Sequence, residues 1–323
     1  MMRLASLALL LLGACVVPDD LLDDRACPCG EGFFCGASQR CLPDGDTSEP
    51  PATPRTCWQP QVCDWSVPGT FTFDQDDGSI WQIDRVSNVS FSPDGCSLLH
   101  ATQLNIFESM RPSATEPFGP AMRMTSISVP DSQHGKGSFG PFGLELFYSS
   151  ALPEEGALVY RSTRSTLEEP FSPGVIVDNL NAPGLNTFDV FLAPHGRRIY
   201  FARGTASEDQ DLLVAERPTL SAPFGPPRRL DELSMDVLSE AEPMVTADGL
   251  TMTYIATPGL GATRQVFYAT RESWNDPWTP RGIVPGDFLA MGDEREGAIS
   301  ADGCELAIIR DPDVIRLVYR SLE

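Results

Sequence analysis

Basic residues are scarce in this chain of 323 residues, and lysine is almost absent. Arginine and lysine together number 23 against 45 aspartates and glutamates, the formal net charge is −22, and the single lysine is Lys136. A protein that binds duplex nucleic acid needs a basic stripe to neutralise phosphates, so nucleic acid is excluded as a partner. The same acidity disfavours direct adsorption to anionic lipid.

Histidine is scarce as well. Only His100, His134 and His195 are present, and no Ser-His-Asp or Cys-His arrangement follows from their positions. His100 follows two leucines in an apolar strand and is expected to be a buried structural residue, whereas His195 falls in a turn and is expected to be exposed to solvent. The sequence therefore predicts no catalytic constellation, no metal site and no cofactor.

An apolar run near the N-terminus, from Leu4 to Leu12, is too short to cross a bilayer as a helix. Together with Arg3 before it, the run has the anatomy of a secretory signal, and its end, Leu-Gly-Ala-Cys, resembles a bacterial lipobox. We therefore predict lipidation of Cys15, with an ordinary signal peptide cleaved after Ala14 as the alternative. Several acyl chains on one residue anchor stably, so the expected location is the bacterial cell envelope, lipid-anchored in the outer membrane and facing the periplasm or the cell surface.

Eight cysteines remain besides the lipidation site, and an even number in an exported chain predicts disulfides. Four of them lie in residues 27–41, which resemble a small EGF-like module and have too little apolar content to build a core. Zinc held by thiolates is the alternative, but an oxidising compartment disfavours it. Cys96 and Cys304 follow equivalent turns that should lie too far apart for a bridge, so one or both are expected to pair with Cys57 or Cys63.

A repeat of about 52 residues organises the rest of the chain. Tight turns that end in glycine recur at intervals of 48, 53, 53 and 54 residues, and a Pro-aromatic pair precedes each of the last four turns, with 25 residues from aromatic to glycine. The glycines are Gly95, Gly143, Gly196, Gly249 and Gly303, and the aromatics are Phe118, Phe171, Phe224 and Trp278. Two independent markers with one period predict the blades of a β-propeller.

The fourth repeat shows the order of strands within a blade. Strand A is predicted at about 242–246, strand B at about 250–256 and strand C at about 265–271, with an Asp-Gly hairpin turn between A and B. Strand D starts near Trp278. The Pro-aromatic pair suits an outermost strand, where proline costs no ladder hydrogen bond and the ring can cover the rim of the blade.

The last repeat lacks strand D because the chain ends soon after strand C. A propeller avoids an open sheet edge only if another segment supplies the missing strand. Phe71, in "GTFTFD", lies 24 residues before Gly95, close to the spacing of the other aromatics. We therefore predict an all-β fold, a β-propeller of five four-stranded blades whose N-terminal strand closes the last blade, with six blades as the alternative.

The predicted domain organisation follows from these segments. The acidic and Pro-rich stretches have almost no apolar content and act as spacers. The order is a lipoprotein signal peptide at 1–14, an acidic tether at 15–26, the disulfide-rich EGF-like module at 27–41, a Pro-rich linker at 42–56 and the propeller at 57–323. A monomer is expected.

The turns resemble those of the TolB-like β-propeller repeat family. The resemblance covers about Thr70 to Arg320 and rests on the turns at 92–95, 246–249 and 300–303 and on the trailing arginines Arg203, Arg217 and Arg271. The second and third repeats depart from the pattern, because Phe142 and His195 replace the turn aspartate, and the geometry of these two turns is expected to differ. The resemblance implies a propeller and a tendency to bind proteins or glycans.

One repeat position, six residues before the turn aspartate, carries a polar side chain in every repeat: Asn88, Lys136, Asp189, Glu242 and Glu296. This is the predicted start of strand A. Because A strands line the central channel of a propeller, the five side chains should form one ring at the channel mouth. Such a ring could hold a cation, an amine or a basic loop of a partner; the alternative is that it only solvates the channel entrance.

These observations predict a membrane-anchored binding or scaffold propeller that recognises an envelope protein or a cell-wall polysaccharide. Recognition would use the channel mouth and a loop face that includes "TPGLGATR" at 257–264. The alternative is a glycan-active hydrolase or lyase that uses the channel-mouth carboxylates. The lack of an arginine cluster for carboxylated sugars favours binding over catalysis.

Overall fold

The computed structural model describes residues 33–35, 41–43, 69–73, 81–82 and 86–322, with gaps at 103–104, 114–115, 128–131, 142, 153–155, 168, 206–209, 235–238, 258–263, 286–293 and 311–313. Side chains are described between Val86 and Ile309, apart from these gaps and from Ser87, Thr257 and 294–297. The predicted signal peptide, the lipidation site Cys15, the acidic tether and, apart from Leu42 and Pro43, the Pro-rich linker lie outside the described residues. None of the helices in the described part is long and apolar enough to cross a membrane.

The chain divides into two compact units, Met1–Thr53 and Pro54–Glu323. In the first unit, β1 (Phe33–Cys35) pairs antiparallel with β2 (Cys41–Pro43). β1 lies in the predicted disulfide-rich module at 27–41, whereas β2 begins at the last residue of that module and continues into the predicted linker.

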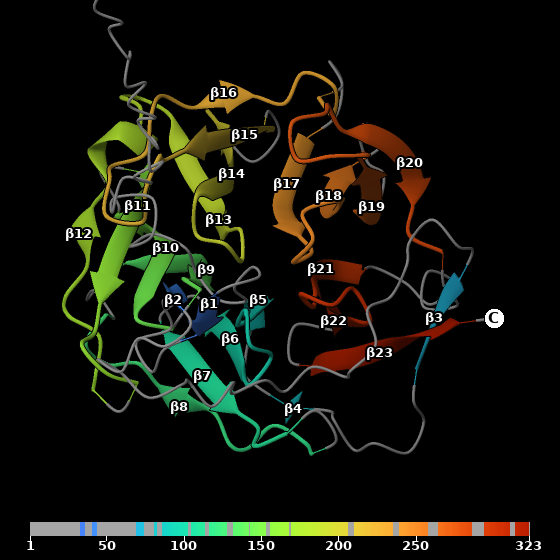
Figure 1. Ribbon diagram of the computed structural model, residues 1–323, viewed down its shortest axis with the longest axis horizontal. Coiled ribbons are helices and arrows are strands. Elements are labelled where there is room, and N and C mark those ends of the chain that lie inside the picture. The colour runs from blue at the N-terminus through green and yellow to red at the C-terminus, as the bar shows by residue number, and fades with distance from the viewer. Residues whose placement is uncertain are drawn as a thin grey trace, which may run out of the picture. The chain divides into compact units, whose positions relative to one another are not determined.

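The second unit is a β-propeller of antiparallel sheets (Figure 1), and each sheet is named here by its first strand. The β5 sheet contains β5 (Val86–Phe91), β6 (Ser97–Thr102), β7 (Ile106–Met110) and β8 (Met122–Arg123). The β9 sheet contains β9 (Gln133–Phe139), β10 (Glu145–Leu152), β11 (Gly156–Thr163) and β12 (Val175–Ile176). The β13 sheet contains β13 (Asn186–Leu192), β14 (Arg198–Gly204), β15 (Gln210–Glu216) and β16 (Arg228–Arg229).

The two remaining propeller sheets continue this arrangement. The β17 sheet contains β17 (Ser239–Val245), β18 (Thr251–Thr257), β19 (Gln265–Thr270) and β20 (Thr279–Ile283). The β21 sheet joins β21 (Glu294–Ile299), β22 (Glu305–Arg310) and β23 (Val314–Leu322) to β3 (Gly69–Phe73), and β4 (Trp81–Gln82) also pairs with β23. A 3₁₀ turn, η2 (Asp178–Leu180), lies between β12 and β13.

The N-terminal strand of the propeller pairs with its C-terminal strand. Phe71 lies opposite Arg320, and Thr72 lies opposite Tyr319. Figure 1 shows β3 beside β23. The predicted pairing of these two segments is therefore confirmed, although one strand opens the propeller sequence and the other ends it.

The first strands of the sheets surround a common centre. β5 contacts β9, β9 contacts β13, β13 contacts β17, β17 contacts β21, and β21 contacts β5. Each sheet thus presents its first strand to the centre and packs against two neighbouring sheets, as expected for a propeller.

The turn glycines are required by the backbone. Their φ angles lie between 66° and 75°, a left-handed conformation that glycine adopts without steric cost. In the fourth turn the N–H of Leu250 donates to Asp248 Oδ1 at 2.9 Å, and in the third the N–H of Arg197 donates to His195 Nδ1 at 3.0 Å. The turn at Gly196 therefore keeps the backbone of the others, contrary to expectation, because an imidazole nitrogen replaces the carboxylate as acceptor. In the second turn Gly143 has the same left-handed φ, and Phe142 lies outside the described residues.

Four arginines, each following the third strand of its sheet, stack on the Pro-aromatic residues. Each Nε donates to the carbonyl of the turn glycine at 2.7–2.8 Å, and each guanidinium lies 4.1–4.8 Å from the ring centroid. The aromatic rings are buried under these cations and do not cover the rim of the blade, which corrects the prediction. These inter-sheet arginines are Arg111, Arg164, Arg217 and Arg271.

Candidate functional site: charged residues at the centre of the propeller

The predicted ring position lies in the middle of the first strands. Lys136, Asp189 and Glu242 are each the fourth residue of their strand, in β9, β13 and β17, and Asn88 is the third residue of β5 and buried. Glu296 belongs to β21, but its side chain lies outside the described residues. The prediction that this position starts strand A is therefore wrong. Each strand begins a few residues before the polar residue, and the apolar pattern of the sequence does not indicate a strand there.

The backbone is irregular at this position. The register of every first strand shifts here, as in a β-bulge, a feature that redirects side chains. Asp189 has φ 56° and Glu242 has φ 54°, and no other non-glycine residue in the described part of the chain has a positive φ. A left-handed backbone costs such residues about 1–3 kcal/mol each, so the fold holds both acids in strained conformations.

Lys136 and Glu242 meet across the centre. Their Nζ and Oε2 atoms lie 3.8 Å apart, and the two side chains are 1% and 3% exposed. Lys136 lies in the β9 sheet and Glu242 in the β17 sheet, and the β13 sheet lies between these two sheets. The ion pair therefore joins two sheets that are not neighbours in the ring. The lysine ammonium therefore supplies a cation from within the protein, in the place where an external cation or amine was expected.

Asp189 faces the same group of charges. Burial raises the pKa of its carboxyl, while Lys136, Arg264 and the backbone N–H of Glu242 act in the opposite direction. The side chain keeps part of its surface exposed, although protein surrounds it on all sides of the centre. The surroundings of Asp189 thus favour the neutral carboxyl more than water does for an ordinary aspartate.

Arg264 was missed by the sequence analysis as a site residue. It precedes β19 and ends the segment "TPGLGATR", which was expected only to form part of a recognition loop. Loops between the second and third strands differ in length from repeat to repeat, so no periodic signal marks this arginine. We refer to Lys136, Asp189, Glu242 and Arg264 as the central charged cluster.

The other candidate residues lie elsewhere. His100 is buried, as predicted, but His195 is half-buried with its ring 4.2 Å from that of Trp274, so the prediction of an exposed side chain is wrong. Cys96 and Cys304 are both disulfide-bonded; pairing with Cys57 or Cys63 stays a prediction, since those cysteines lie outside the described residues. Among the side chains that the structure describes, no group of three or more His, Cys, Asp or Glu residues could hold a metal ion.

Apolar side chains meet at the end of the first strands nearest the turns. Phe91, Phe191, Val245 and Ile299 line a small cavity there together with Pro93 and Pro194. The centre of the propeller is therefore charged at mid-strand and apolar toward the turns, so a polar ligand would reach the central charged cluster from the other end.

Comparison with known proteins shows the fold. No family model and no curated protein matches the chain. A thermostable family-43 glycoside hydrolase matches with TM-score 0.54 and 13% identity over 78% of this chain and 93% of its own. An endo-arabinase from Bacteroides thetaiotaomicron VPI-5482 matches with TM-score 0.53 and 12% identity over 78% and 98%. TolB from Acinetobacter baumannii matches with TM-score 0.45 and 14% identity over 74% and 55%. At these identities the chain is similar to β-propellers in fold alone.

Proposed function

We propose that this protein is a binding propeller of the bacterial cell envelope, anchored through a lipid on Cys15, that recognises a cell-wall polysaccharide or an envelope protein. The observation that carries the proposal is the pair of acids, Asp189 and Glu242, held in left-handed backbone at the centre of the ring. Strain of this kind is stored where a fixed side-chain position serves function.

The pairing of charges supports binding over catalysis. Glu242 already faces Lys136 at 3.8 Å, and Asp189 lies near both Lys136 and Arg264. A cluster whose acids and bases compensate each other presents hydrogen-bonding groups of both signs, as a polar ligand requires. Acid-base hydrolysis of a glycan instead needs two carboxyl groups about 5 to 10 Å apart with separate protonation states.

One observation favours the alternative, a glycan-active hydrolase or lyase. Burial raises the pKa of Asp189, and a carboxyl that keeps its proton can act as a general acid beside a second, ionised carboxylate such as Glu242. This second candidate uses the same residues and is separated from the first by turnover.

The proposal takes the propeller to be a closed ring of five blades. It is supported by the pairing of β3 with β23 and by the contacts that run from β5 through β9, β13 and β17 to β21 and back to β5. A closed ring leaves only the short outermost strands of the blades as sheet edges.

The test uses the lipid-free mature chain and its Glu242→Gln variant on a panel of soluble cell-wall polysaccharides. Binding is measured by calorimetry and hydrolysis by released reducing ends. We expect one polysaccharide class to bind, with at least tenfold weaker binding in Glu242→Gln and no reducing ends released. Asp211→Asn, which removes an exposed carboxylate, should bind as the wild type does.

Two outcomes contradict the proposal. Reducing ends released by the wild type and lost in Glu242→Gln would establish the hydrolase. Equal binding by the wild type and both variants would show that the central charged cluster does not contribute to the binding site. Thermal unfolding of each variant shows whether a loss of binding reflects a loss of fold.

A further inference from the structure

Three of the four inter-sheet arginines form an ion pair with a glutamate of the preceding sheet. The Arg–Glu distances are 3.0 Å, 2.7 Å and 4.0 Å. The pairs are Arg111–Glu305, Arg217–Glu145 and Arg164–Glu108. Arg271 makes no such ion pair with any residue that the structure describes.

The reason is a reversal of charge at one position. Glu145 is the first residue of β10 and Glu305 is the first residue of β22, and each faces the inter-sheet arginine that follows it around the ring. The first residue of β14 is Arg198. Arg271 therefore meets a second guanidinium at the place where its counterparts meet a carboxylate.

Trp274 brings the two arginines together. The guanidinium of Arg198 lies 5.2 Å from its ring centroid and that of Arg271 lies 4.9 Å from it, and both side chains donate to its backbone carbonyl. Arg198 Nε also pairs with Glu216 at 3.0 Å, a carboxylate on the exposed side. Arg271 is only 7% exposed, and burial, reinforced by Arg198, lowers its pKa while Tyr200 opposes the shift.

Two buried nitrogens at this place, Arg271 Nη2 and His195 Nε2, lack a hydrogen-bond partner within the described part of the chain. The Tyr200 hydroxyl oxygen can accept from the guanidiniums of Arg271 and Arg198, which leaves its own proton to donate. The Tyr200 hydroxyl lies beside both guanidiniums, and His195 packs against Trp274. Because His195 Nδ1 accepts the N–H of Arg197, we assign the ring proton to Nε2. Burial and Arg198 lower the pKa of His195 to about 4, so the imidazole is a neutral donor near pH 7.

We propose that Arg198, Arg271, His195 and Tyr200 form a binding site for the carboxylate group of an external ligand, between the β13 and β17 sheets. All the unpartnered groups are donors, and a carboxylate is the group that pairs with the equivalent arginines elsewhere in the ring. Arg111 shows the geometry, with two parallel hydrogen bonds of 3.2 Å and 3.0 Å to Glu305. The site does not depend on the central charged cluster.

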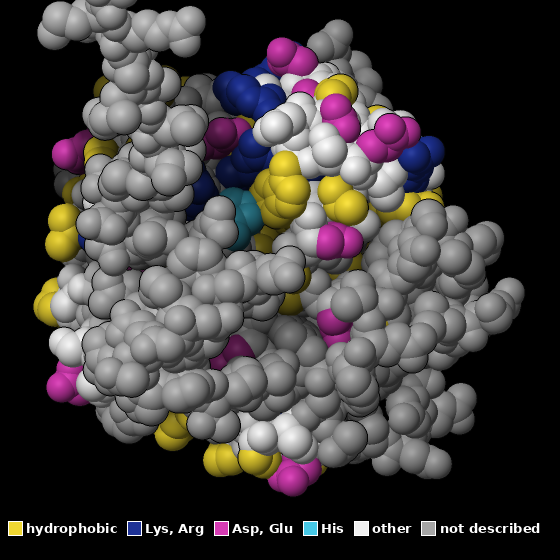
Figure 2. All heavy atoms as spheres, in the orientation of Figure 1, with side chains coloured by type: hydrophobic (Ala, Val, Ile, Leu, Met, Phe, Trp, Pro, Cys, Tyr) yellow, Lys and Arg dark blue, Asp and Glu magenta, His cyan; other side chains and the backbone are white. Residues whose placement is uncertain are grey.

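The surroundings favour a specific anion site. Figure 2 shows Lys and Arg side chains beside a histidine and hydrophobic side chains on one face of the propeller. The chain as a whole carries a net charge of −22 and repels anions elsewhere. No arginine cluster for a carboxylated sugar was found from the sequence, because Arg198 and Arg271 lie 73 positions apart in it and come together only in the fold.

The test titrates the mature chain with galacturonate at constant ionic strength and pH 7 and follows binding by calorimetry and the midpoint of thermal unfolding. Galactose, which lacks the carboxylate, is the matched neutral sugar, and acetate and phosphate are the matched anions. We expect saturable binding of galacturonate with a rise in the midpoint, and neither effect with galactose. Acetate should compete with galacturonate, which would support the carboxylate as the recognised group.

Two charge-reversal variants complete the test. Arg198→Glu supplies an internal carboxylate to Arg271, so binding should fall at least tenfold while the protein stays folded. Arg197→Glu makes the same change of charge at an exposed neighbour and should change affinity less than threefold. Equal losses in both variants, an equal response to galactose, or phosphate binding more than tenfold tighter than any carboxylate would overturn the assignment.

Discussion

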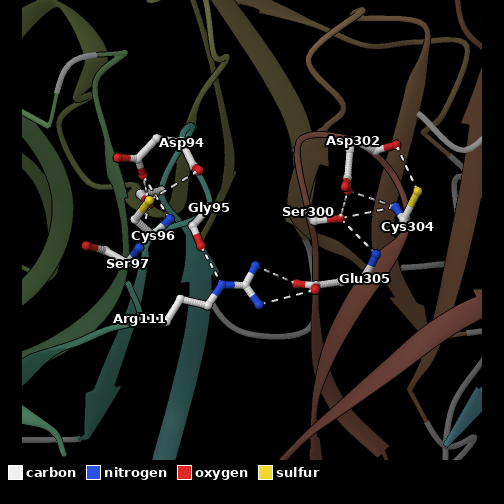
Figure 3. Close-up of polar contacts among 10 residues, drawn as sticks. Asp94, Gly95, Cys96, Ser97, Arg111, Ser300, Asp302, Cys304 and Glu305 are labelled. Carbon is white, nitrogen blue, oxygen red and sulfur yellow. Dashed lines mark hydrogen bonds and ion pairs between the residues drawn. The ribbon is translucent and has the colours of Figure 1, made fainter. Parts of the chain in front are cut away.

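Two interfaces between sheets, β21 with β5 and β13 with β17, have the same backbone positions but different side chains at one of them. At the first, Arg111 and Glu305 form a bidentate pair, 2% and 1% exposed, that joins the last sheet to the first (Figure 3). At the second, Arg198 stands in the position of the glutamate, and Arg271 keeps an unpartnered donor. Identical backbone positions thus close the ring in one place and leave donors for a ligand in another.

This difference separates stability from recognition. A buried arginine with its carboxylate satisfied is part of the framework, whereas a buried donor without a partner costs about 1–3 kcal/mol. Proteins retain such a cost where a ligand or a partner removes it. One residue type, glutamate or arginine at the start of the second strand, decides which role the interface has.

The largest effect is expected from Arg111→Ala, which leaves Glu305 buried without its partner. Removing one member of a buried pair costs about 3–5 kcal/mol, measured as the free energy of unfolding in urea. Arg229→Ala is the control, since its pairs with Asp211 and Asp231 are exposed and should contribute little to the free energy of unfolding. Similar losses in both variants would mean that the closing pair is not special.

A second, smaller loss is expected from Gly249→Ala, which tests the packing of Trp274. A Cβ at Gly249 would lie 2.1 Å from Trp274 Cζ2, and the residue has φ 69°. Gly184→Ala is the matched control, with φ 75° and nothing within 4 Å. Both substitutions carry the left-handed cost of about 1–2 kcal/mol, and Gly249→Ala should add about 1–3 kcal/mol of overpacking and weaken galacturonate binding. Equal losses would show that Trp274 adapts freely.

Arg198→Glu, made together with Glu216→Gln because Glu216 lies opposite it in β15, is expected to act in the opposite direction and stabilise the protein. It gives Arg271 the carboxylate that Arg111 and Arg217 already have, and a hydrogen bond to a charged group contributes about 1.5–3 kcal/mol. Urea unfolding in the absence of added carboxylates measures the gain. A destabilised variant would mean that the two interfaces are not equivalent in geometry.

The smallest effect concerns pH at the closing interface. Burial lowers the pKa of His100 to about 4, against an ordinary value of 6.5, and His100 shares a strand face with Leu98, which packs in one cluster with Leu306. Between these two pKa values the unfolded state binds more protons than the folded state, so stability falls as the pH drops from about 6.5 to about 4. We expect the loss from pH 7 to pH 5 to be about 1–2 kcal/mol smaller in His100→Phe than in the wild type. Identical pH profiles would contradict the shift.

The repeat made much of the fold predictable. Turn glycines and Pro-aromatic pairs recur because each blade needs the same left-handed turn and the same buried ring, and the spacing of Phe71 to Gly95 led to the strand that pairs with β23. The same periodicity placed Asn88, Lys136, Asp189 and Glu242 at equivalent positions. The periodicity did not predict that these residues lie in β-bulges in the middle of the strands. Bulges and positive φ values result from pairing between strands and do not change the hydrophobic alternation of the sequence.

The sequence by itself determined the period, the strand class and the equivalence of positions around the ring, because these depend on local steric preference and on patterns that each repeat carries in full. Tertiary structure alone decided the ion pair between Lys136 and Glu242, the burial of His195 and the meeting of Arg198 with Arg271. Each of these joins side chains from different sheets. The energy of each interaction depends on the distance between the side chains and on their burial, and both are set only when the sheets pack against one another.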